Sequence, residues 1–97
     1  MASLAGLHPQ LRPWAELLVN HYRFTVTSAY RSYTEQLELW RNRAANPFPV
    51  APPGSSYHQY GRAFDVSGPR ERLLEAGRAW RSIGGTWSES DPIHFQA

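Results

Sequence analysis

Residues 56–67 decide how this chain is organised, and they read Ser-Tyr-His-Gln-Tyr-Gly-Arg-Ala-Phe-Asp-Val-Ser. The second half of this segment, residues 61–67, predicts a buried strand. Its apolar side chains are Ala63, Phe64 and Val66. Because Gly61 permits a turn, His58 in the preceding loop can approach Asp65 on the strand. The segment therefore joins a core strand to two side chains that can bind a metal.

The residues before this segment predict a helix and a strand. Apolar residues at three- and four-residue spacing predict a helix over residues 9–22, with Pro13 at its first regular position. Its expected buried face consists of Leu11, Trp14, Leu17, Leu18 and Tyr22. Residues 23–29 alternate in character and are rich in β-formers, so they predict a strand.

A second helix is expected over about residues 33–43. Ser32 and Glu35 have the spacing of a capping box, which begins a helix. The expected buried stripe of this helix consists of Leu37, Trp40 and Tyr33. Residues 44–57 contain four Pro, one Gly and two Ser, which excludes a regular element. A loop this long in a small domain is either disordered or functional, and its position before His58 favours function.

The C-terminal third predicts a helix over residues 70–82, ended by Gly84-Gly85, and strand candidates at 86–88 and 93–96. The expected inner side of the helix consists of Leu73, Leu74, Ala76, Gly77, Trp80 and Ile83. The order of elements predicts an α+β domain. A small, mostly antiparallel sheet should carry the site and pack with about three helices.

Composition limits the classes of protein to which the chain can belong. Its 97 residues suffice for one modest core, so we expect residues 1–97 to form a single catalytic domain. Cysteine is absent, so a metal site must use His and carboxylate ligands. The basic residues are all Arg and lie scattered, and the net charge is only +2. We therefore expect no nucleic-acid partner.

The chain is expected to be a soluble monomer. The N-terminus has neither a basic start nor a long apolar run, so it does not have the pattern of a signal peptide. No segment approaches the roughly 18 apolar residues that span a bilayer. If the protein acts outside the cell, it would then need release by a route other than its own signal.

His58, Asp65 and His94, together with Asp91, have the composition of a catalytic zinc site. Such a site uses three protein ligands, leaves the fourth position to water and has a carboxylate nearby to move a proton. Other interpretations remain for single residues. A His on a strand often only forms hydrogen bonds, and Asp65 could pair with Arg62. Glu89 competes with Asp91 for the role of the base.

The pattern Ser-x-His-x-x-Gly-x-Ala-x-Asp, followed by Asp-x-x-His-Phe, resembles a known family of zinc peptidases. It is the D-alanyl-D-alanine carboxypeptidase and L-alanyl-D-glutamate endopeptidase family, which includes VanY-type enzymes and many phage endolysins and has a hedgehog-related fold. Residues 28–36 also resemble the family's Gly-Tyr-Arg-Ser segment, with Ala29 in place of Gly. The resemblance covers roughly residues 24–97.

The resemblance implies a role for six residues of this sequence. His58, Asp65 and His94 would bind zinc. Asp91 would be the catalytic base, and Arg31 and Ser56 would contact the substrate or polarise its carbonyl. From the residues alone, Arg31 could instead form a surface salt bridge with Glu35 at i, i+4.

The substrate that the resemblance implies is the stem peptide of peptidoglycan. Carboxypeptidases of the family often carry Glu at the position of Asp91, whereas Asp is more like the endolysins that cut L-Ala–D-Glu. We therefore expect an endopeptidase. The alternatives are a D-Ala–D-Ala carboxypeptidase and a zinc-binding module that has lost hydrolysis, as in hedgehog domains.

Overall fold

The computed structural model describes residues 2–97 and contains three helices and three strands. Two short 3₁₀ helices, η1 and η2, lie between the second helix and the second strand. The elements in chain order are α1 (Arg12–Tyr22), β1 (Thr25–Ser28), α2 (Tyr33–Arg41), η1 (Arg43–Ala45), η2 (Tyr57–Tyr60), β2 (Ala63–Ser67), α3 (Arg70–Ser82) and β3 (His94–Gln96).

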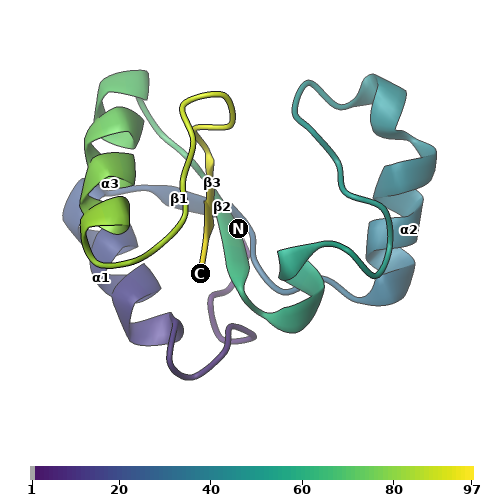
Figure 1. Ribbon diagram of the computed structural model, residues 1–97, viewed down its shortest axis with the longest axis horizontal. Helices are drawn as coiled ribbons and strands as arrows, with labels where there is room; N and C mark the ends of the chain where they lie inside the picture. Colours follow the sequence, from purple (N-terminus) through teal and green to yellow (C-terminus); the bar gives the residue numbers. More distant parts are fainter. Residues whose placement is uncertain (1) are drawn as a thin grey trace.

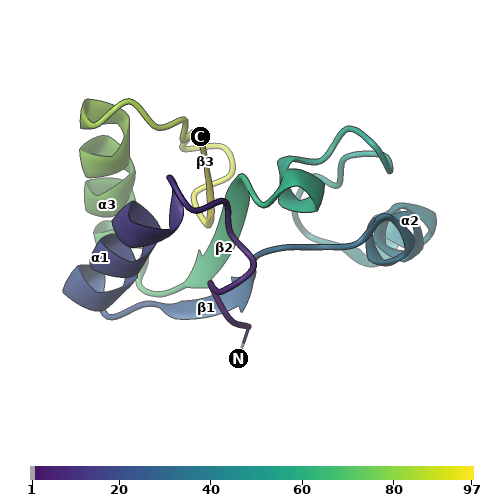
Figure 2. The same ribbon diagram turned by 90° about the horizontal axis from the view of Figure 1, so that it is seen from below.

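The strands form one antiparallel sheet in the order β1-β2-β3. The helices α1 and α3 lie together on one side of the molecule, and α2 lies far from them beyond the sheet (Figure 1). Figure 2 shows the same separation from below. The expected α+β domain with an antiparallel sheet is confirmed.

The apolar core fills the space between the sheet and the α1–α3 pair. The rings of Phe64 and Phe95, which are paired across β2 and β3, stack with their centroids 5.3 Å apart. Trp80 on α3 meets both rings edge-on. Gly77 is required for close packing, because a Cβ atom there would lie 2.1 Å from the ring of Trp87. The core thus fixes β2 and β3 against α3.

The prediction for α1 was right in place and partly wrong in orientation. The inward residues are Leu11, Ala15 and Leu18, at i, i+4 and i+7, whereas Trp14 is 52% and Leu17 63% exposed. The chain bends through turns before Arg12, so Pro13 is the second helical residue and not the first. An apolar stripe wider than the contact surface of the helix leaves its outer members in solvent.

The prediction for α2 was right in its start and wrong in its buried face. The capping box of Ser32 and Glu35 is present. Tyr33 is 60% exposed, Leu37 and Trp40 are only partly buried, and the polar Gln36 is the buried residue of the helix. Because α2 does not pack on the apolar core, its regularly spaced apolar side chains have no core to contact and stay at least partly exposed.

The C-terminal third follows the prediction closely. The helix bounds of 70–82 are confirmed, but Ile83 lies beyond the helix end and is 53% exposed. Of the two strand candidates, residues 94–96 form β3, and residues 86–88 contribute only an isolated bridge between Thr86 and Gln96. No helix among residues 2–97 is long and apolar enough to cross a membrane.

Candidate metal centre

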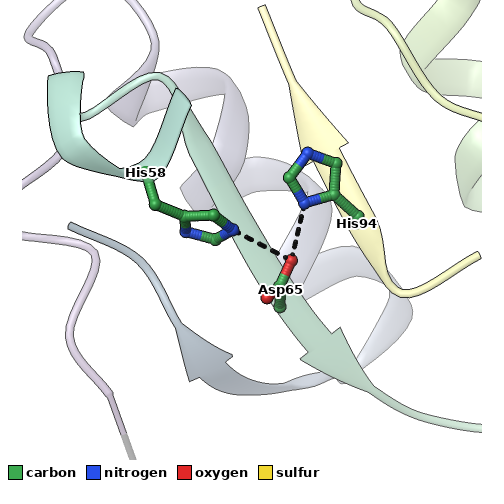
Figure 3. Close-up of side chains that lie close together, drawn as sticks. All are labelled: His58, Asp65 and His94. Atoms are coloured by element: carbon green, nitrogen blue, oxygen red, sulfur yellow. Dashed lines mark hydrogen bonds and ion pairs between the residues drawn. The ribbon is translucent and has the colours of Figure 1, made fainter. Parts of the chain in front are cut away.

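The side chains of His58, Asp65 and His94 converge beside the sheet (Figure 3). Asp65 Oδ1 lies 3.3 Å from His58 Nε2 and 2.9 Å from His94 Nδ1. Asp65 and His94 face each other directly in the β2–β3 register, and His58 reaches them from η2. One nitrogen or oxygen atom from each residue lies within 4.8 Å of the others. This spacing allows all three to bind one metal ion.

The second nitrogen of each imidazole is also held. His58 Nδ1 lies 2.6 Å from the backbone oxygen of Ala29, and His94 Nε2 lies 2.7 Å from Gln96 Oε1. Both outer partners offer an oxygen acceptor, and in a metal-bound site such acceptors hold a proton on the outer nitrogen of each ring and leave the inner nitrogen free to bind the metal. Metal-binding His residues in proteins have the same arrangement.

The turn that presents His58 depends on Ser56 and Gly61. The Ser56 hydroxyl accepts a hydrogen bond from the backbone N–H of His58 and caps η2. Gly61 ends η2 with φ 67°, and a Cβ atom there would lie 2.9 Å from the backbone oxygen of Gly6. The predicted turn at Gly61 is confirmed, and its cause is both the backbone angle and the close approach of residue 6.

The charge on Asp65 is strongly favoured. Burial opposes that charge, but hydrogen bonds from His58 and His94 outweigh burial and hold the pKa of Asp65 well below its ordinary value. For His94, burial opposes the protonated form, but the hydrogen bonds to Asp65 and Gln96 raise its pKa above the ordinary value. The three residues therefore form a hydrogen-bonded network around one carboxylate, and Asp65 and His94 form an ion pair in it when His94 is protonated.

Arg31 completes that network. Its Nη2 atom lies 3.2 Å from Asp65 Oδ2, and the guanidinium also donates to Ser28 Oγ and to Gln36 Oε1. A β-bulge places Ser28 opposite Asp65 and so directs Arg31 toward the site. The alternative pairing of Arg31 with Glu35 is wrong, because the Glu35 side chain accepts from the backbone of Ser32.

The alternative pairing of Asp65 with Arg62 is also wrong. Arg62 Nε donates to the backbone oxygen of Ala97, 2.6 Å away, on the exposed side of the molecule. The Asp65 carboxylate instead contacts the imidazoles of His58 and His94 and the guanidinium of Arg31, so its oxygens face the site.

Asp91 lies at the edge of the same site. A turn in which His94 N–H donates to Asp91 O keeps the two residues together. The Oδ1 atom of Asp91 is buried and has no hydrogen-bond partner among residues 2–97. Burial raises the pKa of Asp91, although the positive charge of His94 opposes the rise. Glu89 is exposed and does not line the cavity, so the structure brings Asp91 and not Glu89 to the candidate ligands.

The site opens into a cavity of about 480 Å³. Its walls include the candidate ligands, Asp91, Arg31 and Ser56 on the sheet side. The opposite wall is formed by residues 46–51 of the Pro-rich loop, which was expected to be functional. The cavity thus lies between the sheet and the loop.

Two polar residues of the site were not assigned from the sequence. Gln36 is 1% exposed, accepts from Arg31 and donates to the backbone oxygen of Ala51, so it ties the loop to the site. Gln96 accepts from His94. The available signals were positional: Gln36 follows the capping Glu35, and Gln96 lies two residues after His94 on a strand.

Comparisons with known proteins agree with the geometry. The family model of VanY, described as D-alanyl-D-alanine carboxypeptidase, matches residues 14–86. This match includes His58 and Asp65 and stops before Asp91 and His94. A search of curated proteins finds no match.

Two solved structures share the fold. One is the vancomycin resistance D,D-dipeptidase VanXYg in complex with a D-Ala-D-Ala phosphinate analogue, with a TM-score of 0.73, 20% identity and 93% of this chain covered. The other is the L-Ala D-Glu endopeptidase ChiX of Serratia marcescens, with a TM-score of 0.62, 25% identity and 96% of this chain covered. The present chain spans 49% of the VanXYg chain and 81% of the ChiX chain. The expected resemblance is confirmed, and the chain belongs to the VanY family of D-alanyl-D-alanine carboxypeptidases.

Proposed function

We propose that the chain is a single-domain, zinc-dependent peptidase that hydrolyses the stem peptides of peptidoglycan, and that it cuts the L-Ala–D-Glu bond. The observation that carries this proposal is the convergence of His58, Asp65 and His94 beside the unpartnered carboxylate oxygen of Asp91, in one open cavity.

The donor set fits zinc. Two imidazole nitrogens and one carboxylate oxygen form a common ligand set of catalytic zinc sites, which leave a position open for water or substrate. The outer hydrogen bonds of His58 and His94 already direct one nitrogen of each ring inward. When bound, zinc supplies Lewis acidity, which polarises a carbonyl and lowers the pKa of water.

Asp91 is the proton carrier of the proposed reaction. Its buried Oδ1 atom has no partner to compete for a proton, and its raised pKa makes it a better proton acceptor. In the forward reaction Asp91 takes a proton from the attacking water and delivers it to the nitrogen of the leaving amine. The bond broken is the peptide C–N bond, and water supplies the new oxygen of the carboxylate.

Arg31 and Ser56 would act on the substrate from the sheet side of the cavity. The Arg31 guanidinium lines the cavity while three protein partners hold it in place. A fixed cation of this kind can stabilise the negative charge that develops on the carbonyl oxygen. Ser56 is buried, and its hydroxyl accepts the hydrogen bond from His58 N–H that caps η2. Its main role is therefore to position His58.

The choice of an internal bond is supported by the partners of Arg31. A carboxypeptidase needs a cation that is free to bind the terminal carboxylate, but Arg31 is already engaged by Asp65, Ser28 and Gln36. The other cavity-lining residues that can carry positive charge are His58 and His94. Asp in place of Glu at position 91 and the similarity to an L-Ala D-Glu endopeptidase support the same choice.

The second candidate is a D-Ala–D-Ala carboxypeptidase. It is favoured by the description of the family and by the presence of Arg31 in the cavity, if substrate displaces one of its present partners. An inactive zinc-binding module is less well supported, because such a module has no need of a carboxylate in the position of Asp91.

Mass spectrometry of digested muropeptides of defined sequence tests the proposal. An endopeptidase should release a fragment with a new D-Glu N-terminus, and a chelator should stop its release. Release of D-Ala would instead support the second candidate. Cleavage that persists in excess chelator, after the metal has been removed, would overturn the metal mechanism.

A further inference from the structure

We propose that Gln96 is the positioning residue that fixes the ring of His94, so that Nδ1 and not Nε2 faces the metal. This inference rests on the proposed function, since it concerns the same metal centre. The observation behind it is the 2.7 Å contact between His94 Nε2 and Gln96 Oε1, on the side of the ring away from Asp65.

The contact follows from the alternation of side chains on β3. Residues 94, 95 and 96 are successive on one strand, so His94 and Gln96 point to one face and Phe95 to the other. Phe95 is fully buried in the apolar core, which fixes the orientation of the strand. Gln96 is therefore placed on the face that carries the metal ligands.

The backbone of Gln96 is held from both sides. Its N–H donates to the backbone oxygen of Thr86, and its oxygen accepts from Thr86 N–H and from the indole N–H of Trp80. On the β2 side, the register partner of Gln96 is Ala63, whose small side chain leaves room beside the amide of Gln96. A rigid backbone and an unobstructed side chain make Gln96 a precise anchor for an imidazole.

The two imidazoles of the site differ in this respect. His58 is oriented by the backbone oxygen of Ala29, a contact that no side-chain substitution can remove. His94 is oriented by a side chain, so its orientation can be changed by mutation. Without Gln96, rotation about the Cα–Cβ and Cβ–Cγ bonds could present Nε2 in place of Nδ1, with no partner on the outer nitrogen to oppose it.

The expected effect is on metal affinity. Outer hydrogen-bond partners of metal-binding His residues typically contribute about 10- to 100-fold in affinity. Gln96→Leu removes the acceptor and keeps the size, and Gln96→Asn keeps the amide but shortens its reach. Both should weaken zinc binding by about 10- to 100-fold, whereas Gln96→Glu keeps an acceptor and should bind zinc at least as tightly as the parent.

The test combines two readouts that do not depend on activity. Zinc affinity is measured by competition with a chromophoric chelator, and ¹⁵N chemical shifts of the His94 ring report which nitrogen is bonded to zinc. The control is Gln10→Leu, which makes the same chemical change at an exposed residue that does not line this cavity. Circular dichroism establishes that each variant is folded.

The parent protein should show zinc on Nδ1 of His94, and Gln96→Leu should show weaker binding with a mixture of the two nitrogens. Parent-like zinc affinity and Nδ1 ligation in both Gln96→Leu and Gln96→Asn would overturn the inference, as would a raised KM with unchanged affinity, which would assign Gln96 to substrate binding. A parent that binds no zinc would instead count against the proposed function.

Discussion

The two walls of the cavity are attached to the molecule in different ways. The sheet wall, formed by β2 and β3, is backed by the apolar core with α1 and α3. The opposite wall belongs to an arm, residues 33–54, that contains α2, η1 and most of the Pro-rich loop. No arm residue takes part in the apolar core, and hydrogen bonds from Arg31 to Gln36 and from the Gly54 N–H to Gln59 attach the arm to the rest of the molecule. The sheet wall carries the candidate metal ligands, and the other wall is attached through polar contacts.

The largest expected effect is on steady-state kinetics: a substitution on the sheet wall should lower kcat, and one on the arm should raise KM. Asp91→Asn on the sheet wall should lower kcat by about 10²- to 10⁴-fold, the usual contribution of general acid–base catalysis, with zinc content unchanged. Phe48→Ala on the arm should mainly raise KM, because Phe48 lines the cavity and is not one of the candidate ligands. Steady-state kinetics on a defined muropeptide distinguish the two, and Glu89→Gln is the matched control for Asp91. Parent-like kcat in Asp91→Asn would remove Asp91 from its proposed role.

The next effect is on the free energy of unfolding, which a substitution on the sheet wall should lower much more than one on the arm. Phe95→Ala should lower the free energy of unfolding by about 3–5 kcal/mol, because Phe95 is fully buried among aromatic rings. Tyr33→Ala on the arm should change it by no more than about 0.5 kcal/mol, since Tyr33 is mostly exposed. Urea unfolding measures both. Equal losses in the two variants would show that the arm is part of the cooperative core.

A smaller effect is expected at Gln36, whose hydrogen bond with Arg31 attaches the arm to the site. Gln36→Leu leaves the oxygen of Ala51 and one N–H group of Arg31 without their partner, at a cost of about 1–3 kcal/mol. Hydrogen exchange should quicken in residues 46–51 and stay unchanged in β2 and β3. Slow exchange in the loop of this variant would mean that other contacts hold it.

The pattern of correct and wrong predictions follows the same division. The bounds of α3 were predictable, and so was the strand expected at 61–67, of which 63–67 form β2, because their apolar residues do face a core. The buried face of α2 was not, because Leu37, Trp40 and Tyr33 have helical spacing without a core behind them. Trp40 instead lies under the guanidinium of Arg43, 3.9 Å from its ring centroid.

The candidate ligands were predictable because their residue types are scarce in the chain and their spacing is specific. Gln36 and Gln96 were not, because a neutral amide has no distinctive pattern in sequence. Its role depends on which atoms the fold brings to it, and here those atoms are Arg31 Nη1 and His94 Nε2.

The smallest expected effect is the pH dependence of the metal-free protein. The pKa of Asp65 is lowered in the folded state, so its stabilisation is present above its unfolded value of about 3.9 and is lost as pH falls. The pKa of His94 is raised, so its stabilisation is complete below about 6.5 and is lost as pH rises through the folded value. The difference in unfolding free energy between the parent and Asp65→Asn should therefore be largest between about pH 4 and 6.5. A difference that stays constant from pH 3 to 8 would contradict the ion pair network.

The most direct test of the central claim is the zinc content of the purified protein after dialysis against buffer that contains traces of zinc. We predict one zinc per chain for the parent and less than one tenth of that for His58→Ala, Asp65→Ala and His94→Ala, each checked for folding. A parent protein without zinc, or three ligand variants that retain a full equivalent, would contradict the assignment of His58, Asp65 and His94 as the metal centre.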